Sequence, residues 1–320
     1  MSENRPIPII LDTDIGDNVD DALALAFACQ CPQLRLVGVS TVYRDPWRRA
    51  GIALATLNAL DRRDVPVAAG IGKPLFRPWD RSAPKHYELK FAKHVKRLDR
   101  RHAVRFLIQT VNTEAVSKVP APLNDASGKT LRELFEPVTV CCIGPLTNLA
   151  VALATEPTLA EQIRIVLMGG MIGERRLETN IAADPEAAKL VFSCGADIIM
   201  VGLDVTLQCV LTSEQLERIR SCDRPHTRLL SRMIDSWLTQ SGRQPVLHDP
   251  LAVAMCFDPS LCGIQSMEIT VETSDDGQAG RTVAHASADR RTNVCTTVDR
   301  DRFINLFLNR ICSAPRAIEE

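Results

Sequence analysis

The chain has 320 residues, with 38 basic and 39 acidic side chains and a formal net charge of -1. This balance argues against nucleic acid or an anionic membrane surface as the main partner, and no apolar stretch approaches the ~18 residues that a membrane span needs. The length permits a sizeable core in one large α/β domain.

In chain order, short apolar and β-branched runs alternate with helical patterns. We expect strands at residues 9–11, 36–42, 65–69, 138–143, 163–168 and 196–203. We expect helices at residues 50–60, from residue 149 onward and at 185–192. Alternation of this kind is typical of βαβ units. The sequence therefore predicts an α/β fold with a doubly wound, mostly parallel central sheet and helices on both faces.

Two segments depart from this alternation. Residues 74–101 are rich in His, Lys and Arg and contain three prolines, which favours a long loop or flap. Alternating hydropathy between residues 267 and 298, broken by turn residues, predicts a late antiparallel addition that a helix over 300–311 closes. Because the chain has no internal repeat and no low-complexity linker, we expect a single domain over residues 1–320.

The 11 cysteines are odd in number and mostly lie in apolar contexts, such as Cys141 and Cys142 in a strand-like run. The residues before the first predicted strand do not resemble a signal peptide. We therefore expect buried free thiols and a cytoplasmic location.

Five acidic residues crowd one turn near the start of the chain: Asp12, Asp14, Asp17, Asp20 and Asp21. An apolar run before them predicts a buried strand, and Asp20 opens a predicted amphipathic helix, so the acids lie at the usual place for a site on an open α/β sheet. Carboxylates this close repel one another unless a hard cation neutralises them. Oxygen ligands without a nearby His or Cys favour Ca²⁺ or Mg²⁺ over zinc. Helix capping would explain Asp20 or Asp21, but hardly the other three.

Further polar segments follow later predicted strands and are expected at the same edge of the sheet. They are Asp45, residues 144–148, residues 168–170, Asn180 with Asp184, and residues 248–250. With the acidic turn, these segments resemble the inosine-uridine nucleoside hydrolase family. The resemblance rests on residues 12–16 with 20–22, 144–148, 168–170, 178–181 with 184–187, and 248–252. These motifs occur in family order over about residues 6 to 310, and five in order are strong evidence where any one would be weak.

The resemblance implies Ca²⁺-dependent hydrolysis of the N-glycosidic bond of a ribonucleoside, with a small-molecule nucleoside as substrate and a homodimer or homotetramer as the assembly. The metal ligands that it implies are Asp14, Asp21, Asp249 and the backbone carbonyl of Thr147, with Asp14 also the general base. The residues that it implies around the substrate are Asp20, Glu178, Asn180 and Asp249 on the ribose hydroxyls, Met168 in the pocket wall, and Asp45 where relatives have an Asn.

The implied chemistry is coherent. Carboxylates stabilise the oxocarbenium-like state of hydrolysis at an anomeric carbon, and a cation lowers the pKa of its water so that a neighbouring Asp can take the proton. His248, beside Asp249, could protonate the leaving base or orient the loop by hydrogen bonding.

Departures from the family pattern leave the substrate open. Two extra residues precede Asp20, Asp45 replaces an Asn, and the stretch between Gly170 and Glu178 is short. These changes fall around the ribose 5′ end and the leaving group, so a purine, a pyrimidine or a modified base all remain possible. Two other interpretations are a phosphoryl-transfer hydrolase of the Asp-x-Asp type and a catalytically silent Ca²⁺-dependent ribose-binding protein.

Overall fold

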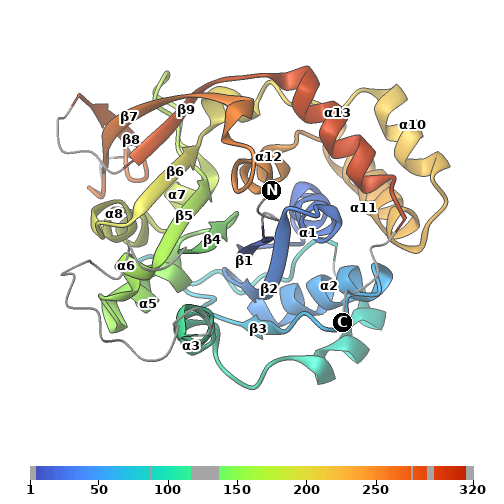
Figure 1. Cartoon of the computed structure of the whole chain (residues 1–320), viewed down its shortest axis with the longest axis horizontal. Helices are drawn as coiled ribbons and strands as arrows, with labels where there is room; N and C mark the ends of the chain where they lie inside the picture. The colour runs from blue at the N-terminus through green and yellow to red at the C-terminus, as the bar shows by residue number, and fades with distance from the viewer. Residues whose placement is uncertain (1–4, 87, 117–136, 275–276, 287–291, 315–320) are drawn as a thin grey trace.

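The computed structural model describes residues 5–86, 88–116, 137–274, 277–286 and 292–314 (Figure 1). Within these residues the strands form one nine-stranded sheet. The strands are β1 (Ile7–Thr13), β2 (Leu34–Thr41), β3 (Val67–Ala69), β4 (Val138–Cys142), β5 (Ile163–Met168), β6 (Asp197–Val201), β7 (Cys262–Val271), β8 (Thr282–His285) and β9 (Thr292–Val298). Their order across the sheet is β3-β2-β1-β4-β5-β6-β9-β7-β8.

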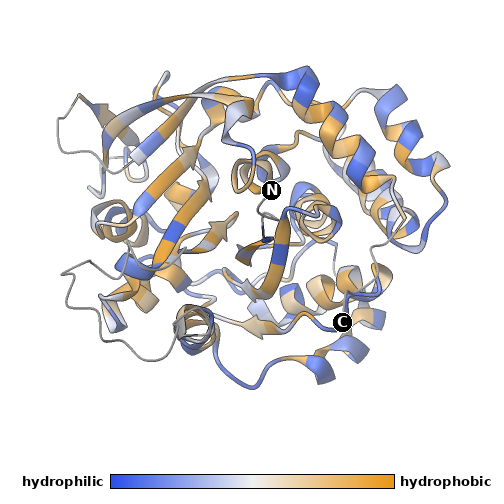
Figure 2. Ribbon diagram, in the orientation of Figure 1, coloured by the Kyte–Doolittle hydropathy of each residue, from blue (hydrophilic) through white to orange (hydrophobic). Residues whose placement is uncertain are grey.

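Helices pack on both faces of this sheet. They are α1 (Asp20–Gln30), α2 (Pro46–Ala59), α3 (Ala103–Val116), α5 (Thr147–Thr155), α6 (Leu159–Gln162), α7 (Thr179–Ala183), α8 (Pro185–Ser193), α9 (Leu203–Thr206), α10 (Ser213–Ser221), α11 (Pro225–Ser241), α12 (His248–Met255) and α13 (Arg300–Ile311), with 3₁₀ helices η1 (Leu89–Arg97) and η2 (Pro259–Leu261). One buried apolar cluster holds α1, α2 and α10 to α13, and a second holds α3, α5, α6 and α8. Figure 2 shows apolar residues concentrated in the central strands between these layers.

The parallel part of the sheet runs from β3 to β9, and β7 and β8 are antiparallel. This architecture confirms the predicted α/β fold with a mostly parallel sheet and a late antiparallel part. Within that late part β9 lies parallel to β6 and separates it from β7, an order on which the sequence pattern made no prediction. Period-two hydropathy indicates a half-buried strand but carries no information on which neighbour it pairs with.

The helix α1 begins at Asp20, as predicted, but it is not amphipathic. All of its residues are buried, because α1 contacts the sheet, α2, α11, α12 and α13. Phe27 packs against the rings of Phe257 and Phe307, with centroid distances of 6.3 and 5.4 Å. A helix that is enclosed on every side needs no polar face, so its two acids at the N-terminus lie inside the protein.

The segment 74–101 contains η1 as its regular element and is otherwise irregular. Its η1 packs on α2, and the backbone N–H of His86 donates to the carbonyl of Gly16 at 2.8 Å. The side chain of His86 is buried in this arrangement, with 6% exposure. Among the described helices, none is long and apolar enough to cross a membrane.

The order of the strands decides where a site can form. The chain winds outward from β1 to β3 on one side, and from β4 to β6 on the other, so β1 and β4 flank a topological switch point. The loops that follow these two strands meet at their carboxyl ends, where the N–H of Ile143 donates to the carbonyl of Asp12 at 2.8 Å. Crevices of open α/β sheets lie at such a point.

We predict that Phe106→Ala destabilises the protein by about 3–5 kcal/mol, the usual cost of emptying a buried phenylalanine site. Phe106 of α3 is fully buried, and its ring fills the space beside Gly38 of β2, where an added Cβ would overlap it. The matched control is Phe76→Ala, because Phe76 is 77% exposed and exposed substitutions stay within about 0.5 kcal/mol. Urea unfolding measures both, and equal midpoints for the two variants would contradict this packing.

Candidate metal centre and active site

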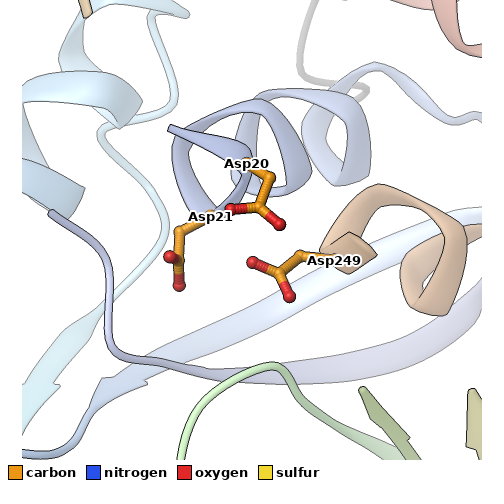
Figure 3. A group of neighbouring side chains, drawn as sticks. All are labelled: Asp20, Asp21 and Asp249. Carbon is orange, nitrogen blue, oxygen red and sulfur yellow. The ribbon is translucent and has the colours of Figure 1, made fainter. Parts of the chain in front are cut away.

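Three buried carboxylates lie close together beside the starts of two helices (Figure 3). Asp20 and Asp21 are the first two residues of α1, and Asp249 is the second residue of α12. One oxygen from each lies within 4.8 Å of the others, and each residue is at most 4% exposed. The N-termini of two helices therefore converge on the group, and their dipoles favour negative charge at that position.

Electrostatics makes this group unstable without a partner. Burial raises the pKa of Asp20 to about 7, and burial with repulsion from neighbouring acids raises the pKa of Asp21 and of Asp249 well above the usual range. Asp21 accepts a bond from the Thr13 hydroxyl at 2.6 Å, whereas Oδ1 of Asp20 has no partner among the described residues. An orphaned oxygen among buried carboxylates fits a hard divalent cation.

Asp14 follows β1 directly and lines the same cavity as the three carboxylates. Burial, the largest effect, raises its pKa to about 6, while Arg49 lowers it and Asp17 raises it. Gly144 lies against it, since an added Cβ there would be 2.8 Å from the Asp14 nitrogen and 2.9 Å from Oδ1. Because Gly144 has no side chain, the loop after β4 can approach Asp14 closely.

The cavity has a volume of about 420 Å³, within the range of small-molecule sites. The predicted site residues that line it are Asp14, Asp20, Asp21, Met168, Glu178, Asn180, His248 and Asp249. They come from the carboxyl ends of β1 and β5, and from the N-termini of α1, α7 and α12. The fold therefore brings eight of the ten predicted residues to one cavity.

Asp45 does not line the cavity. It caps α2, and its carboxylate accepts from the N–H of Arg48 at 3.1 Å. Tyr43 and Arg44 reach the cavity from this loop instead, with φ angles of 71° and 55°. Two consecutive left-handed residues turn the chain there. The sequence motif that suggested Asp45 as a site residue contains no information on these backbone angles.

Thr147 also lies outside the cavity lining, within the first turn of α5, and its hydroxyl donates to Asp184 at 2.6 Å. Ile143, four residues earlier, lines the cavity. The carbonyl of Ile143 accepts from Nδ2 of Asn180 at 3.3 Å. Ile143, rather than Thr147, is therefore the residue of the loop after β4 that lines the cavity.

Glu178 and Asn180 are fixed by the start of α7. The buried carboxylate of Glu178 accepts from the N–H groups of Gly170, Asn180 and Ile181 at 3.1, 2.8 and 2.9 Å. The amide nitrogen of Asn180 also donates to the carbonyl of Met168 at 3.2 Å. The side-chain nitrogen Nδ2 of Asn180 is therefore engaged by the main chain, and the side-chain oxygen Oδ1 is left for a ligand.

His248 begins α12, next to Asp249. Its Nδ1 lies 2.8 Å from the Thr206 hydroxyl. Burial, with a smaller effect from Arg176, lowers the pKa of His248 to about 4. The imidazole is therefore neutral at pH 7, which weakens the case for a pre-protonated general acid.

Asp12 supports the site from beneath. It is fully buried and absent from the cavity lining, and its Oδ1 accepts from Ser40 at 2.5 Å and from Asn148 at 2.8 Å. Burial raises its pKa to about 7. Asp12 thus connects β1 to β2 and to α5. Its position among the five acidic residues of the turn was the sequence feature that pointed to Asp12.

Sequence reasoning assigned no specific role to several residues of the cavity wall. These are Arg44, Lys85, Arg176, Leu177, Leu203, Leu207 and Trp237. Trp237 lies on α11, and its indole Nε1 has no hydrogen-bond partner among the described residues. An aromatic residue in a helical pattern is typical of a core position. The sequence therefore did not distinguish Trp237 from a core residue.

Comparison with known proteins agrees with this geometry. The family model described as inosine-uridine preferring nucleoside hydrolase matches residues 9–305. The pyrimidine-specific ribonucleoside hydrolase RihA of Shewanella sp. (strain MR-4) is 34% identical over 322 residues, covering 95% of this chain and 96% of that protein. RihA of Photobacterium profundum is 34% identical over 325 residues, covering 96% and 99%.

Solved structures agree as well. The purine-preferring ribonucleoside hydrolase from Gardnerella vaginalis superposes with a TM-score of 0.79 at 27% identity, covering 95% of this chain and 98% of that one. An inosine-guanosine nucleoside hydrolase superposes with a TM-score of 0.80 at 20% identity, with the same coverage, and supports the fold. The chain therefore belongs to the inosine-uridine preferring nucleoside hydrolase family, and it is an N-glycosyl hydrolase that acts on ribonucleosides.

Proposed function

We propose that this hydrolase depends on Ca²⁺ held at the floor of the cavity. The observation that carries the proposal is the group of Asp20, Asp21 and Asp249, with oxygens within 4.8 Å and an orphaned Oδ1 on Asp20. The donor set is all oxygen, which favours Ca²⁺ or Mg²⁺, and a cluster of carboxylates with a main-chain carbonyl is typical of Ca²⁺.

Asp21 and Asp249 of this group are proposed side-chain ligands, together with Asp14 from the same cavity, and the carbonyl of Ile143 takes the place of that of Thr147. This change is supported by the lining of the cavity, which includes Ile143 and omits Thr147. Asp20, the third member of the group, gains its counter-charge from the same cation and uses its unpaired oxygen on the ribose. When bound, the cation would orient the ribose diol and lower the pKa of a water.

The residues of the chain supply the remaining chemistry. Asp14 is the proposed general base, because its carboxylate lies in the cavity and can accept a proton from the attacking water. Asp20, Asp249 and the side-chain oxygen of Asn180 are proposed to bind the ribose hydroxyls. Glu178 would add negative charge near the ribose, where positive charge develops in the oxocarbenium-like state.

The proposed substrates are pyrimidine ribonucleosides. Support comes from the two RihA proteins, which are named pyrimidine-specific and cover nearly the whole chain. The Gardnerella vaginalis enzyme, named purine-preferring, is less similar at 27% identity. Release of ribose from uridine, cytidine and inosine measures this preference, and faster turnover of inosine would reverse it.

His248 is proposed to contact the leaving base as a neutral imidazole. Its lowered pKa and its contact with Thr206 support a hydrogen-bonding role over transfer from an imidazolium ion. A cytoplasmic location is also proposed, since the described cysteines are free and mostly buried.

We predict that removal of Ca²⁺ makes stability strongly pH-dependent. In the metal-free protein the folded-state pKa of Asp20 is raised to about 7, and the pKa values of Asp21 and Asp249 are raised well above their unfolded values. The folded state then binds more protons than the unfolded state above about pH 4, so stability falls as the pH rises towards 7 and beyond. Melting temperatures from pH 5 to 8, with EDTA or with Ca²⁺, test this. Parallel curves would contradict a cation at the cluster.

We predict that Asp14→Asn lowers kcat by at least ~10²-fold, the usual scale for loss of a general base. The amide keeps the size of the side chain and a possible ligating oxygen. The matched control is Asp45→Asn, which keeps a good helix cap outside the cavity and should change kcat less than about twofold. Calorimetric titration with Ca²⁺ separates loss of the base from loss of the ion. An Asp14→Asn enzyme that binds Ca²⁺ and keeps wild-type turnover would exclude Asp14 as the base.

We predict that His248→Ala slows uridine hydrolysis at least ~10²-fold, the usual cost of losing one hydrogen-bond donor to developing negative charge, while it spares p-nitrophenyl riboside. The nitrophenolate leaves without a proton, so it needs little help from a hydrogen-bond donor. The ratio of kcat/KM losses on the two substrates is the measurement. Equal losses on both would mean that His248 acts by positioning Asp249, because that role serves every leaving group.

A further inference from the structure

Arg49, in the first turn of α2, is the one arginine or lysine that is fully buried among the residues the structure describes. A buried guanidinium is unfavourable unless its donors are satisfied. All three of its nitrogens are used. Nε donates to the carbonyl of Tyr43 at 2.9 Å, and Nη2 donates to Oδ2 of Asp17 at 2.7 Å. Nη1 donates to the carbonyl of Asp14 and, at 3.2 Å, to that of Ile15.

These four acceptors belong to two different loops. Asp14, Ile15 and Asp17 lie between β1 and α1, in the turn that leads to the acidic cluster, whereas Tyr43 lies between β2 and α2. Arg49 therefore connects the loop of a proposed metal ligand to the loop that supplies a wall of the cavity.

The loop after β2 needs such a connection. Tyr43 and Arg44 are both left-handed, a strained conformation for residues with a Cβ. Their N–H groups each donate at 2.8 Å, to the carbonyls of Ile71 and Gly72. The carbonyl of Tyr43 accepts from Arg49, and the carbonyl of Arg44 accepts from Trp79 at 3.0 Å. Both the N–H group and the carbonyl group of Tyr43 and of Arg44 are therefore hydrogen-bonded, which stabilises the conformation that brings the two side chains to the cavity.

Asp17, in the turn between β1 and α1, completes the network. Its carboxylate accepts from Arg49 and, at 3.3 Å, from Arg44. Asp17 is the anionic partner of the Arg49 charge, and the other acceptors of that guanidinium are main-chain carbonyls. Arg49 therefore fixes the path of the chain at Asp14 without occupying its carboxylate.

We propose that Arg49 is a positioning residue that sets Asp14 for cation binding and holds Tyr43 in the cavity wall. The planar guanidinium group of Arg49 donates to acceptors in several directions at once, which the single ammonium group of a lysine cannot do. Residues that orient metal ligands from behind typically contribute 10–100-fold to affinity or activity. The inference rests on the proposed role of Asp14 as a ligand.

A competing effect has the opposite sign. Arg49 carries a positive charge near a site for a cation, so a purely electrostatic role predicts that its removal strengthens Ca²⁺ binding. A positioning role predicts weaker binding. The direction of the change in Ca²⁺ affinity separates the two.

The experiment is calorimetric titration of metal-free protein with Ca²⁺, together with kcat and KM for uridine. We expect Arg49→Met to weaken Ca²⁺ binding at least ~10-fold, and Arg49→Lys to weaken it similarly although it keeps the charge. Added guanidinium ion should restore part of the affinity of Arg49→Met. The matched control is Arg77→Met, because Arg77 is a partly buried arginine paired with Glu186 at 2.8 Å outside the cavity, and we expect a change of less than about twofold.

Unchanged or tighter Ca²⁺ binding in folded Arg49→Lys would overturn the inference, whatever its melting temperature. If Arg49→Met does not fold, Arg49→Lys still decides, since it retains the charge and most of the volume. A wild-type protein that binds no Ca²⁺ would contradict the proposed cofactor instead. Wild-type kcat and KM in Arg49→Lys would then overturn the role of Arg49 separately.

Discussion

The repulsion among buried carboxylates is the constraint on which the rest of this structure depends. One oxygen from each of Asp20, Asp21 and Asp249 lies within 4.8 Å of the others, away from solvent, and burial together with mutual repulsion raises the pKa values of the three carboxyl groups. Two helix N-termini aim at the cluster, yet dipoles of this kind offset only a small part of such a cost. A hard cation would relieve this repulsion and let the carboxylates ionise at neutral pH, which is the physical basis of the proposed metal site.

The surroundings of the cluster keep its oxygens free. Asp12 engages Ser40 and Asn148 below it, and Arg49 bonds main-chain carbonyls and Asp17. Neither group occupies the oxygens that a cation or a ribose would need. A buried arginine that bonded the cluster directly would neutralise it and block the site, so the position of Arg49 behind the main chain preserves the function.

The cavity wall comes from segments that are far apart in the sequence. Lys85 comes from the 74–101 segment, Arg176 and Leu177 from the loop before α7, and Trp237 from α11. The floor is assembled from strand ends and helix starts of the family fold, whereas the wall depends on loops and on the helices α9 and α11. This division explains how relatives named for pyrimidines and for purines can share one fold, because loops vary more readily than the scaffold that carries the chemistry.

The sequence by itself determined the fold class, the family and most of the floor of the site. Alternating apolar runs specify βαβ units, and acids at strand ends reach one edge because parallel strands all end there. Tertiary structure alone decided that β9 lies between β6 and β7, that α1 is enclosed, and that Tyr43 and Ile143 line the cavity while Asp45 and Thr147 do not. Strand order and the direction of a side chain in a loop depend on contacts between distant residues and on single backbone angles. Local sequence patterns do not encode either.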